Sequence, residues 1–132
     1  MLQDITTGNT AADGKEFNFW FIGNVQQWCG ERGIQFNPKQ YGLRNTGRIE
    51  IKWGMYSKGE ERTVWAATSD KTALSILIRG DFTFRFREPG KDDLIKEVRL
   101  CKEGDYALWN ESLEHTWQMQ EDSVTLTLRW PP

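Results

Sequence analysis

The chain has 132 residues, of which 38% are hydrophobic and 27% are charged, with a formal net charge of -2. This composition is typical of one globular domain with a sizeable core, and it lacks the basic stripe that a nucleic-acid partner would require. No apolar run approaches the roughly 20 residues of a membrane span and no signal peptide is visible, so we expect a cytoplasmic protein that makes no membrane contact.

The N-terminal third of the chain shows no strand pattern of its own. Residues 1–15 are rich in small polar residues without an apolar period, which predicts a flexible tail. The aromatic run 17–24 is expected to pack on the domain as a strand or a clamp. Helical spacing follows, with Asn24 as the candidate N-cap and Gly33 as the candidate end of the helix. Residues 36–47 contain proline and glycine and indicate a loop.

From residue 48 onward, apolar and polar residues alternate with the period of two that is typical of half-buried strands. The alternation is clearest at 48–55 and 123–130, and a hairpin is expected with its turn near Gly80. Further short strands are expected at 62–67, 72–79, 82–87, 94–100, 104–109 and 113–119. Seven or eight strands with almost no helix among them predict a single all-β sandwich or barrel.

The stretch GDYALWNESLEHTW contains the only histidine of the chain, His115. Gly104 and His115 have the separation of the glycine and the histidine in the second cupin motif. Asn110 and Ser112 occupy the places where that motif has proline and glycine. On these residues and on the strand order, the chain resembles the cupin superfamily over roughly residues 48–130.

The resemblance implies an all-β, single-domain fold. A cupin-like double-stranded β-helix, or jelly-roll barrel, would span residues 16–132, with its core at 48–130 and a short N-terminal extension. Cupins often pair through edge strands or exchanged terminal strands, so the resemblance also implies a homodimer.

Cupin metal sites usually take two histidines and a glutamate from a first motif, together with the histidine of the second. Counted from Gly54, the first-motif histidine positions hold Glu60 and Arg62. One imidazole with scattered carboxylates is a poor site for iron, nickel or zinc, so we expect no metal and no other cofactor. A hard ion held by Glu60, Glu61 and His115 is the remaining metal alternative.

His115 shares the face of its predicted strand with Leu113 and Trp117, and an apolar face on a barrel strand points inward. Its imidazole either fills the core and bonds a backbone carbonyl, or lines a ligand pocket. In a pocket it would be able to carry protons. Metal-free cupin-like sugar epimerases use a histidine base and a tyrosine acid, for which Tyr56 and Tyr106 are the candidates here.

The tryptophans suggest a carbohydrate-like ligand, because flat apolar faces stack on sugar rings. Trp65, Trp109 and Trp117 are the pocket candidates. Trp53 and Trp130 are in phase with aliphatic strand residues, and we expect both in the core.

Three functions therefore remain open. The first is binding of a small polar or sugar-like ligand in the barrel without a transition metal. The second is a metal-free isomerase or epimerase with His115 as general base and Tyr56 as its partner. The third is a structural or interaction protein with a filled barrel. Arg62 either meets an anionic group of the ligand or pairs with a neighbouring glutamate. The candidate ligand-binding residues are His115, Trp117, Trp109, Trp65, Arg62 and Tyr56.

Overall fold

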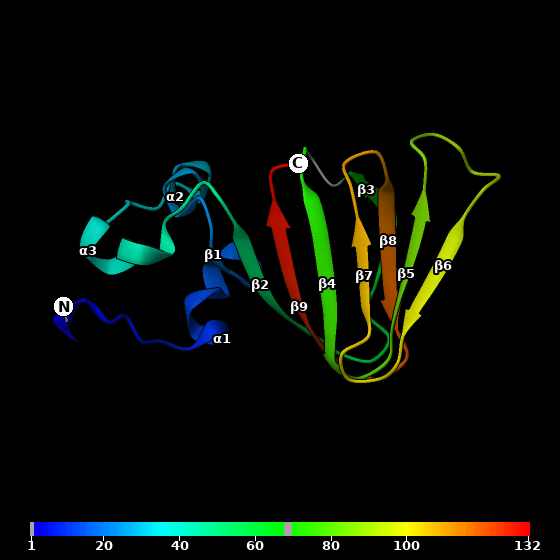
Figure 1. The fold of residues 1–132 in the computed structure, drawn as a ribbon, viewed down its shortest axis with the longest axis horizontal. Coiled ribbons are helices and arrows are strands. Elements are labelled where there is room, and N and C mark those ends of the chain that lie inside the picture. The colour runs from blue at the N-terminus through cyan, green and yellow to red at the C-terminus, as the bar shows by residue number, and fades with distance from the viewer. Residues whose placement is uncertain (1, 68–69) are drawn as a thin grey trace.

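The computed structural model describes residues 2–67 and 70–132. Nine strands in these ranges form two antiparallel sheets, with the order β1-β2-β9-β4-β7 in the first and β3-β8-β5-β6 in the second (Figure 1). The strands are β1 (Trp20–Ile22), β2 (Glu50–Tyr56), β3 (Glu61–Ala67), β4 (Thr72–Arg79), β5 (Phe82–Arg87), β6 (Lys96–Leu100), β7 (Tyr106–Trp109), β8 (Glu114–Met119) and β9 (Ser123–Trp130). The expected all-β jelly-roll barrel is confirmed.

The connection between β4 and β5 differs from the predicted hairpin. Strand β4 pairs with β7 and β9, whereas β5 pairs with β6 and β8 in the opposite sheet. Gly80 has a φ of 111°, and a Cβ at this position would clash with the side chain of Ser123 and the carbonyl of Asp122. The hairpin prediction is therefore wrong, because Gly80 lies where the chain crosses from one sheet to the other.

The four-stranded sheet turns its apolar residues inward, as the alternation predicts. Phe82, Phe84 and Phe86 of β5 and Met119 of β8 are all buried in one core cluster. Each pairs across the ladder with a residue on the same inner face, for example Phe84 with Trp117. This sheet provides most of the aromatic packing inside the barrel.

The five-stranded sheet has the opposite arrangement. Its inner face is largely polar, and Ser75 and Thr127 share a buried 2.5 Å hydrogen bond between their hydroxyls. The aliphatic residues that share a strand face with Trp53 and Trp130 therefore point outward. Both tryptophans lie on this outer face and are only half-buried. The prediction that Trp53 and Trp130 belong to the core is wrong, because alternation identifies the residues that share a face but not which face is inside.

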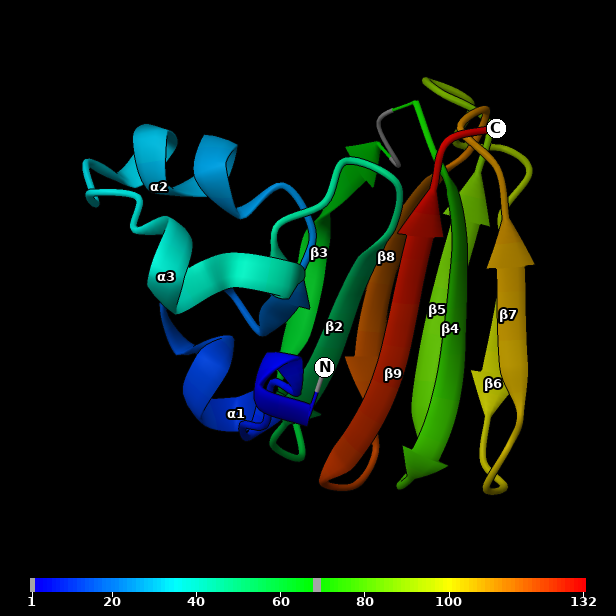
Figure 2. The same cartoon turned by 60° about the vertical axis from the view of Figure 1, so that its left-hand side comes forward.

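Residues 2–46 form an extension beside β2, at one end of the sheets (Figures 1 and 2). It contains the helices α1 (Thr10–Asp13), α2 (Val25–Arg32) and α3 (Pro38–Tyr41), with 3₁₀ turns at Leu2–Asp4, Lys15–Phe17 and Gly42–Arg44. A second small core holds it together, with Phe17, Val25, Cys29 and Tyr41 buried. None of the helices in the described ranges is long and apolar enough to cross a membrane.

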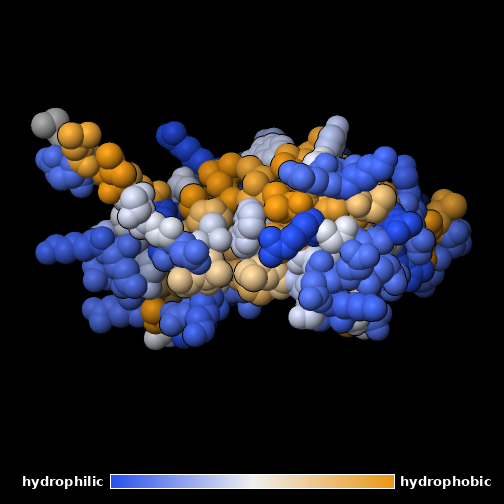
Figure 3. All heavy atoms as spheres, turned by 90° about the horizontal axis from the view of Figure 1, so that it is seen from below, coloured by the Kyte–Doolittle hydropathy of each residue, from blue (hydrophilic) through white to orange (hydrophobic). Residues whose placement is uncertain are grey.

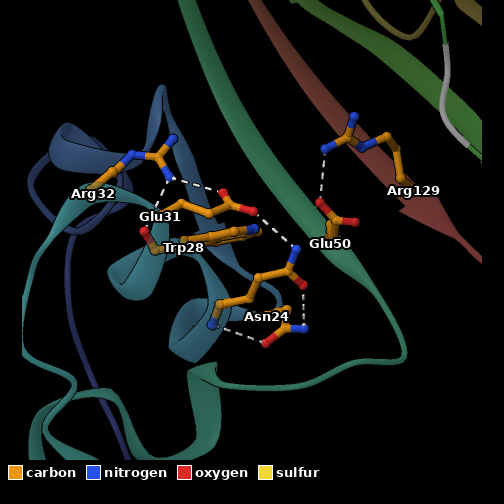
Figure 4. A network of polar contacts seen from close by, with 7 residues as sticks. Asn24, Trp28, Glu31, Arg32, Glu50 and Arg129 are labelled. Atoms are coloured by element: carbon orange, nitrogen blue, oxygen red, sulfur yellow. Dashed lines mark hydrogen bonds and ion pairs between the residues drawn. The ribbon is translucent and has the colours of Figure 1, made fainter.

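Local capping explains where these helices begin. The Asn24 side chain accepts a 3.3 Å hydrogen bond from the backbone N–H of Gln27 (Figure 4), and Gly33 ends α2 with a φ of 67°. This helix is confirmed. The predicted loop at 36–47 instead includes α3 and a 3₁₀ turn, because Asn37 caps a helix that begins on Pro38.

The predicted tail, residues 1–15, also contains structure. Asn9 caps α1 through its side-chain oxygen, and Arg44 donates a 3.0 Å hydrogen bond to the Asp13 carbonyl. Most side chains from residue 2 to residue 12 are nevertheless exposed. The flexibility of this segment stays a prediction.

Candidate functional site

A cavity of about 560 Å³ opens between the two sheets. This volume is in the range of small-molecule sites, so the barrel is not filled by its own side chains. Strands of both sheets line the cavity, and the segment Asn18–Trp20 of the extension closes one side. The residues with chemically distinctive side chains on its wall are Trp20, Lys52, Tyr56, Glu60, Arg62, Trp109, His115, Trp117 and Arg129.

His115 lies among aromatic rings on this wall. Its ring centroid is 5.3 Å from that of Trp109 and 6.3 Å from that of Phe84. Its Nδ1 is buried and has no hydrogen-bond partner among residues 2–67 and 70–132, so this atom does not form the expected bond to a backbone carbonyl of these residues. Burial, followed by the charges of nearby arginine and lysine side chains, lowers the pKa of His115 to about 4. The imidazole is therefore neutral at pH 7.

Of the two candidate tyrosines, only Tyr56 lines the same cavity as His115. Its ring centroid lies 5.0 Å from that of Trp117, and burial raises the pKa of its hydroxyl to about 12. Tyr106 is 64% exposed and stands on the outer face of β7, opposite Ile76. Tyr106 therefore cannot serve as an acid for chemistry at His115.

Three cationic side chains also line the cavity, of which only Arg62 was predicted. Lys52 comes from β2 and Arg129 from β9, and both flank Trp20, with Lys52 Nζ 5.2 Å and Arg129 Cζ 3.9 Å from its ring centroid. Arg129 Nη2 also donates to Glu50 Oε2 at 2.8 Å (Figure 4). Burial, then repulsion from Arg129 and Arg62, lowers the pKa of Lys52 to about 8.

Lys52 and Arg129 alternate with apolar residues, as solvent-facing residues usually do, and this is why sequence reasoning missed them. A signal was present in β9, where threonine is repeated at 125 and 127 before Arg129. Such a regular polar face is compatible with a strand that lines a water-filled cavity as well as with a strand that faces bulk solvent. Trp20 was predicted only to pack on the domain, and the sequence gives no indication that it would reach the barrel interior.

The three candidate tryptophans are divided between two faces. Trp109 and Trp117 line the cavity. Trp65 does not, because its ring lies on the outer face of the four-stranded sheet, 4.3 Å from Cζ of Arg87. Arg87 in turn donates a 2.9 Å hydrogen bond to Glu114. The predicted place of Trp65 in the pocket is therefore corrected, and its contact with Arg87 gives it a structural role on the surface.

The surroundings of His115 do not fit the metal ion that cupins usually hold. Among the described residues, no three His, Cys, Asp or Glu side chains gather closely enough to bind one. The charged groups that act on His115 are Arg62, Lys52 and Arg129, all of which repel a cation. Glu60 and Glu61 are both exposed, and of the two only Glu60 lines the cavity, where its carboxylate accepts a hydrogen bond from the Ser57 N–H.

No family model and no curated protein sequence matches the chain. Several solved structures share its fold. A cupin superfamily protein from Desulfitobacterium hafniense DCB-2 has a TM-score of 0.55 at 14% identity, covering 68% of this chain and 73% of that one. KdgF from Halomonas sp. has a TM-score of 0.54 at 16% identity, covering 68% and 74%. The Drosophila melanogaster CENP-C cupin domain has a TM-score of 0.51 at 11% identity, covering 67% and 63%.

The chain therefore has a cupin-like fold, and the resemblance that rests on Gly104 and His115 is confirmed at the level of the fold. At 11–16% identity these matches carry no activity over to this chain. Its function has to be argued from the cavity.

Proposed function

We propose that the chain binds a small polar, sugar-like ligand in the barrel cavity without using a transition metal. The observation that carries this proposal is the cavity of about 560 Å³ between the two sheets, whose wall includes the imidazole of His115. Trp109 and Trp117 supply flat apolar faces beside it.

The electrostatics of the cavity favour binding over isomerase chemistry. A general base works best when its pKa lies near the working pH, whereas the pKa of His115 is lowered to about 4. The pKa of Tyr56 is raised to about 12, which makes its hydroxyl a weak acid. The cavity itself argues against the third alternative, a purely structural barrel.

A matched pair of tryptophan variants tests ligand binding in the cavity. Ligands found by thermal shift in a panel of sugars and sugar derivatives are titrated by calorimetry into wild type, Trp117→Phe and Trp65→Phe. Trp117→Phe should weaken binding by up to about fivefold, since stacking on an aromatic face contributes on the order of 1 kcal/mol and phenylalanine has a smaller ring. Trp65→Phe should leave the Kd unchanged, because Trp65 lies outside the cavity. Equal effects of the two variants, or a panel without any ligand, would contradict the proposal.

We also propose that the chain forms a homodimer through the outer face of the five-stranded sheet. In Figure 2 no helix lies in front of β9, β4 and β7, and in Figure 3 apolar surface gathers along one side of the molecule. The large apolar residues on this face are Ile51, Trp53, Leu74, Ile76, Tyr106, Leu108, Leu126, Leu128 and Trp130. None of these residues is charged. In a two-fold dimer this face would pack against the same face of a second copy, and no charged side chain among these residues would be buried without a partner.

Light scattering after size exclusion tests the dimer. The measured mass of wild type should be twice that of one chain. Leu108→Glu should lower the measured mass toward that of the monomer, because a dimer would bury the carboxylate against apolar residues of the partner. Leu108 is 57% exposed in one chain, so the substitution should not unfold it. Val64→Glu is the control, since Val64 is 75% exposed on β3 of the other sheet. A monomeric wild type, or the same shift in both variants, would refute this interface.

A further inference from the structure

We infer that the ligand of the cavity carries an anionic group, a carboxylate or a phosphate, bound by Lys52, Arg62 and Arg129. The inference rests on the proposed binding function and adds the chemical class of the ligand. It is carried by the convergence of three cationic side chains from three different strands, β2, β3 and β9, on one cavity.

Strand pairing places these cations on the inner faces of the two sheets. Lys52 pairs with Thr127 and Arg129 pairs with Glu50, so Lys52 and Arg129 are diagonal neighbours on one sheet and share the Trp20 ring. Arg62 pairs with Trp117 on the facing sheet. An anion between the sheets would therefore be reached from both sides.

The cations are only partly neutralised by the protein. Arg129 bonds Glu50, and the other carboxylate oxygen of Glu50 is bound by Lys71 at 2.7 Å. Within residues 2–67 and 70–132, neither Lys52 nor Arg62 forms an ion pair, and Glu60 is the one carboxylate among the residues that line the cavity. Arg62 is exposed to solvent, whereas Lys52 and Arg129 are half-buried. Like charges that converge in a partly dehydrated site raise the free energy of the folded protein unless a counter-charge joins them.

The net charge of the whole chain does not explain this arrangement, because it is -2. The positive charge is concentrated inside the cavity of an overall acidic protein. A guanidinium offers several N–H donors in a fork that matches the oxygens of a carboxylate or phosphate, and an ammonium adds a further donor. The remaining wall, with its tryptophans and His115, suits the uncharged, polar body of the same ligand.

Matched pairs of anionic and uncharged probes test the inference. Calorimetry at pH 7 compares glucuronate with glucuronamide, glucose 6-phosphate with glucose, and benzoate with benzamide. The anionic member of at least one pair should bind at least about tenfold more tightly than its uncharged counterpart. Whether that pair contains a carboxylate or a phosphate shows which anionic group the cavity recognises. If uncharged members bind as tightly as anionic ones, this inference fails while the proposed binding function stands. If no member of any pair binds, both fail.

Charge-removing variants locate the effect in the cavity. Lys52→Met and Arg62→Gln should each lower the affinity for the anion by about tenfold and that for the uncharged probe by much less. Arg85→Gln is the control, because Arg85 makes the same change in net charge from the outer face of β5, where its side chain is 44% exposed. An equal loss in Arg85→Gln would assign the attraction to the general charge of the protein and overturn the inference.

A measurement on the unmutated protein guards against variants that fail to fold. The chain has one histidine, so the C–H signals of His115 can be assigned directly by NMR. An anion bound beside Lys52, Arg62 and Arg129 should offset their repulsion and raise the pKa of His115 from about 4. A bound anion that leaves this pKa unchanged lies elsewhere and contradicts the inference.

Discussion

Acidification from pH 6.5 to pH 4 should cost the wild-type protein about 3 kcal/mol of unfolding free energy through His115 alone. Its pKa is lowered from 6.5 in the unfolded chain to about 4 in the folded protein. Between these values the unfolded chain binds a proton that the folded protein excludes, so stability falls as the pH falls. Above pH 6.5 both states are neutral at His115 and this contribution vanishes.

Urea unfolding at intervals from pH 4 to pH 8 measures this effect, with His115→Asn as the matched variant. The carboxylates of the chain titrate in both proteins, so the difference between the two curves isolates the imidazole. The stability of wild type relative to His115→Asn should decline steadily below pH 6.5. Parallel curves would mean that water or a ligand solvates the imidazole in the folded protein, and the low pKa would then be refuted.

Lys52→Met should increase the unfolding free energy at pH 7 by about 3 kcal/mol. The pKa of Lys52 is lowered from 10.5 to about 8 by burial and by the charges of Arg129 and Arg62, so the charged form is held in the folded protein at a cost of about 1.4 kcal/mol per pKa unit. Methionine keeps the length and apolar character of the stem and removes the ammonium group. A stabilising substitution at a cavity residue is expected where function requires an unfavourable charge.

The pH dependence of the Lys52→Met effect provides the check. From pH 8 to pH 10.5 the unfolded wild type still holds the Lys52 proton while the folded protein has released it, so wild-type stability rises with pH and the advantage of the variant shrinks. Lys102→Met is the control, because Lys102 is exposed in a turn and should change stability by less than about 0.5 kcal/mol. A destabilised Lys52→Met variant would show that contacts of Lys52 with Trp20 and Tyr56 outweigh its burial.

Alternation in the sequence predicts the positions of strands β2 to β9 along the chain. Alternation does not indicate which face of a strand lies inside the barrel, because it only divides the residues into two faces. Which face points inward depends on what the barrel encloses. The four-stranded sheet follows the ordinary rule, with Phe84 and its neighbours buried. The five-stranded sheet reverses the rule, since its inner face borders a polar cavity that Lys52 lines and in which Thr127 bonds Ser75.

The position of Gly80 shows a second limit of the sequence. A glycine and an aspartate between two apolar runs usually close a hairpin, and local sequence does not distinguish this from a crossing between sheets. The deciding contact comes from a distant segment, because Ser123 Oγ accepts a hydrogen bond from the Asp81 N–H at 3.0 Å. Arg129 and Trp20 reach the cavity for the same reason, through pairing with β2, whose neighbours in the sheet are far away in the chain.

Trp20 belongs to two parts of the molecule at once. It lies on β1, a strand of three residues that attaches the extension to the sheet, and its ring forms part of the cavity wall. Opening of that short strand would remove a wall of the cavity, and any ligand that rests on the ring binds only while the strand is closed. Ligand binding and local unfolding of the extension are therefore linked equilibria. A bound ligand would slow proteolysis and hydrogen exchange in the extension, although the extension contributes few of the contacts to the ligand.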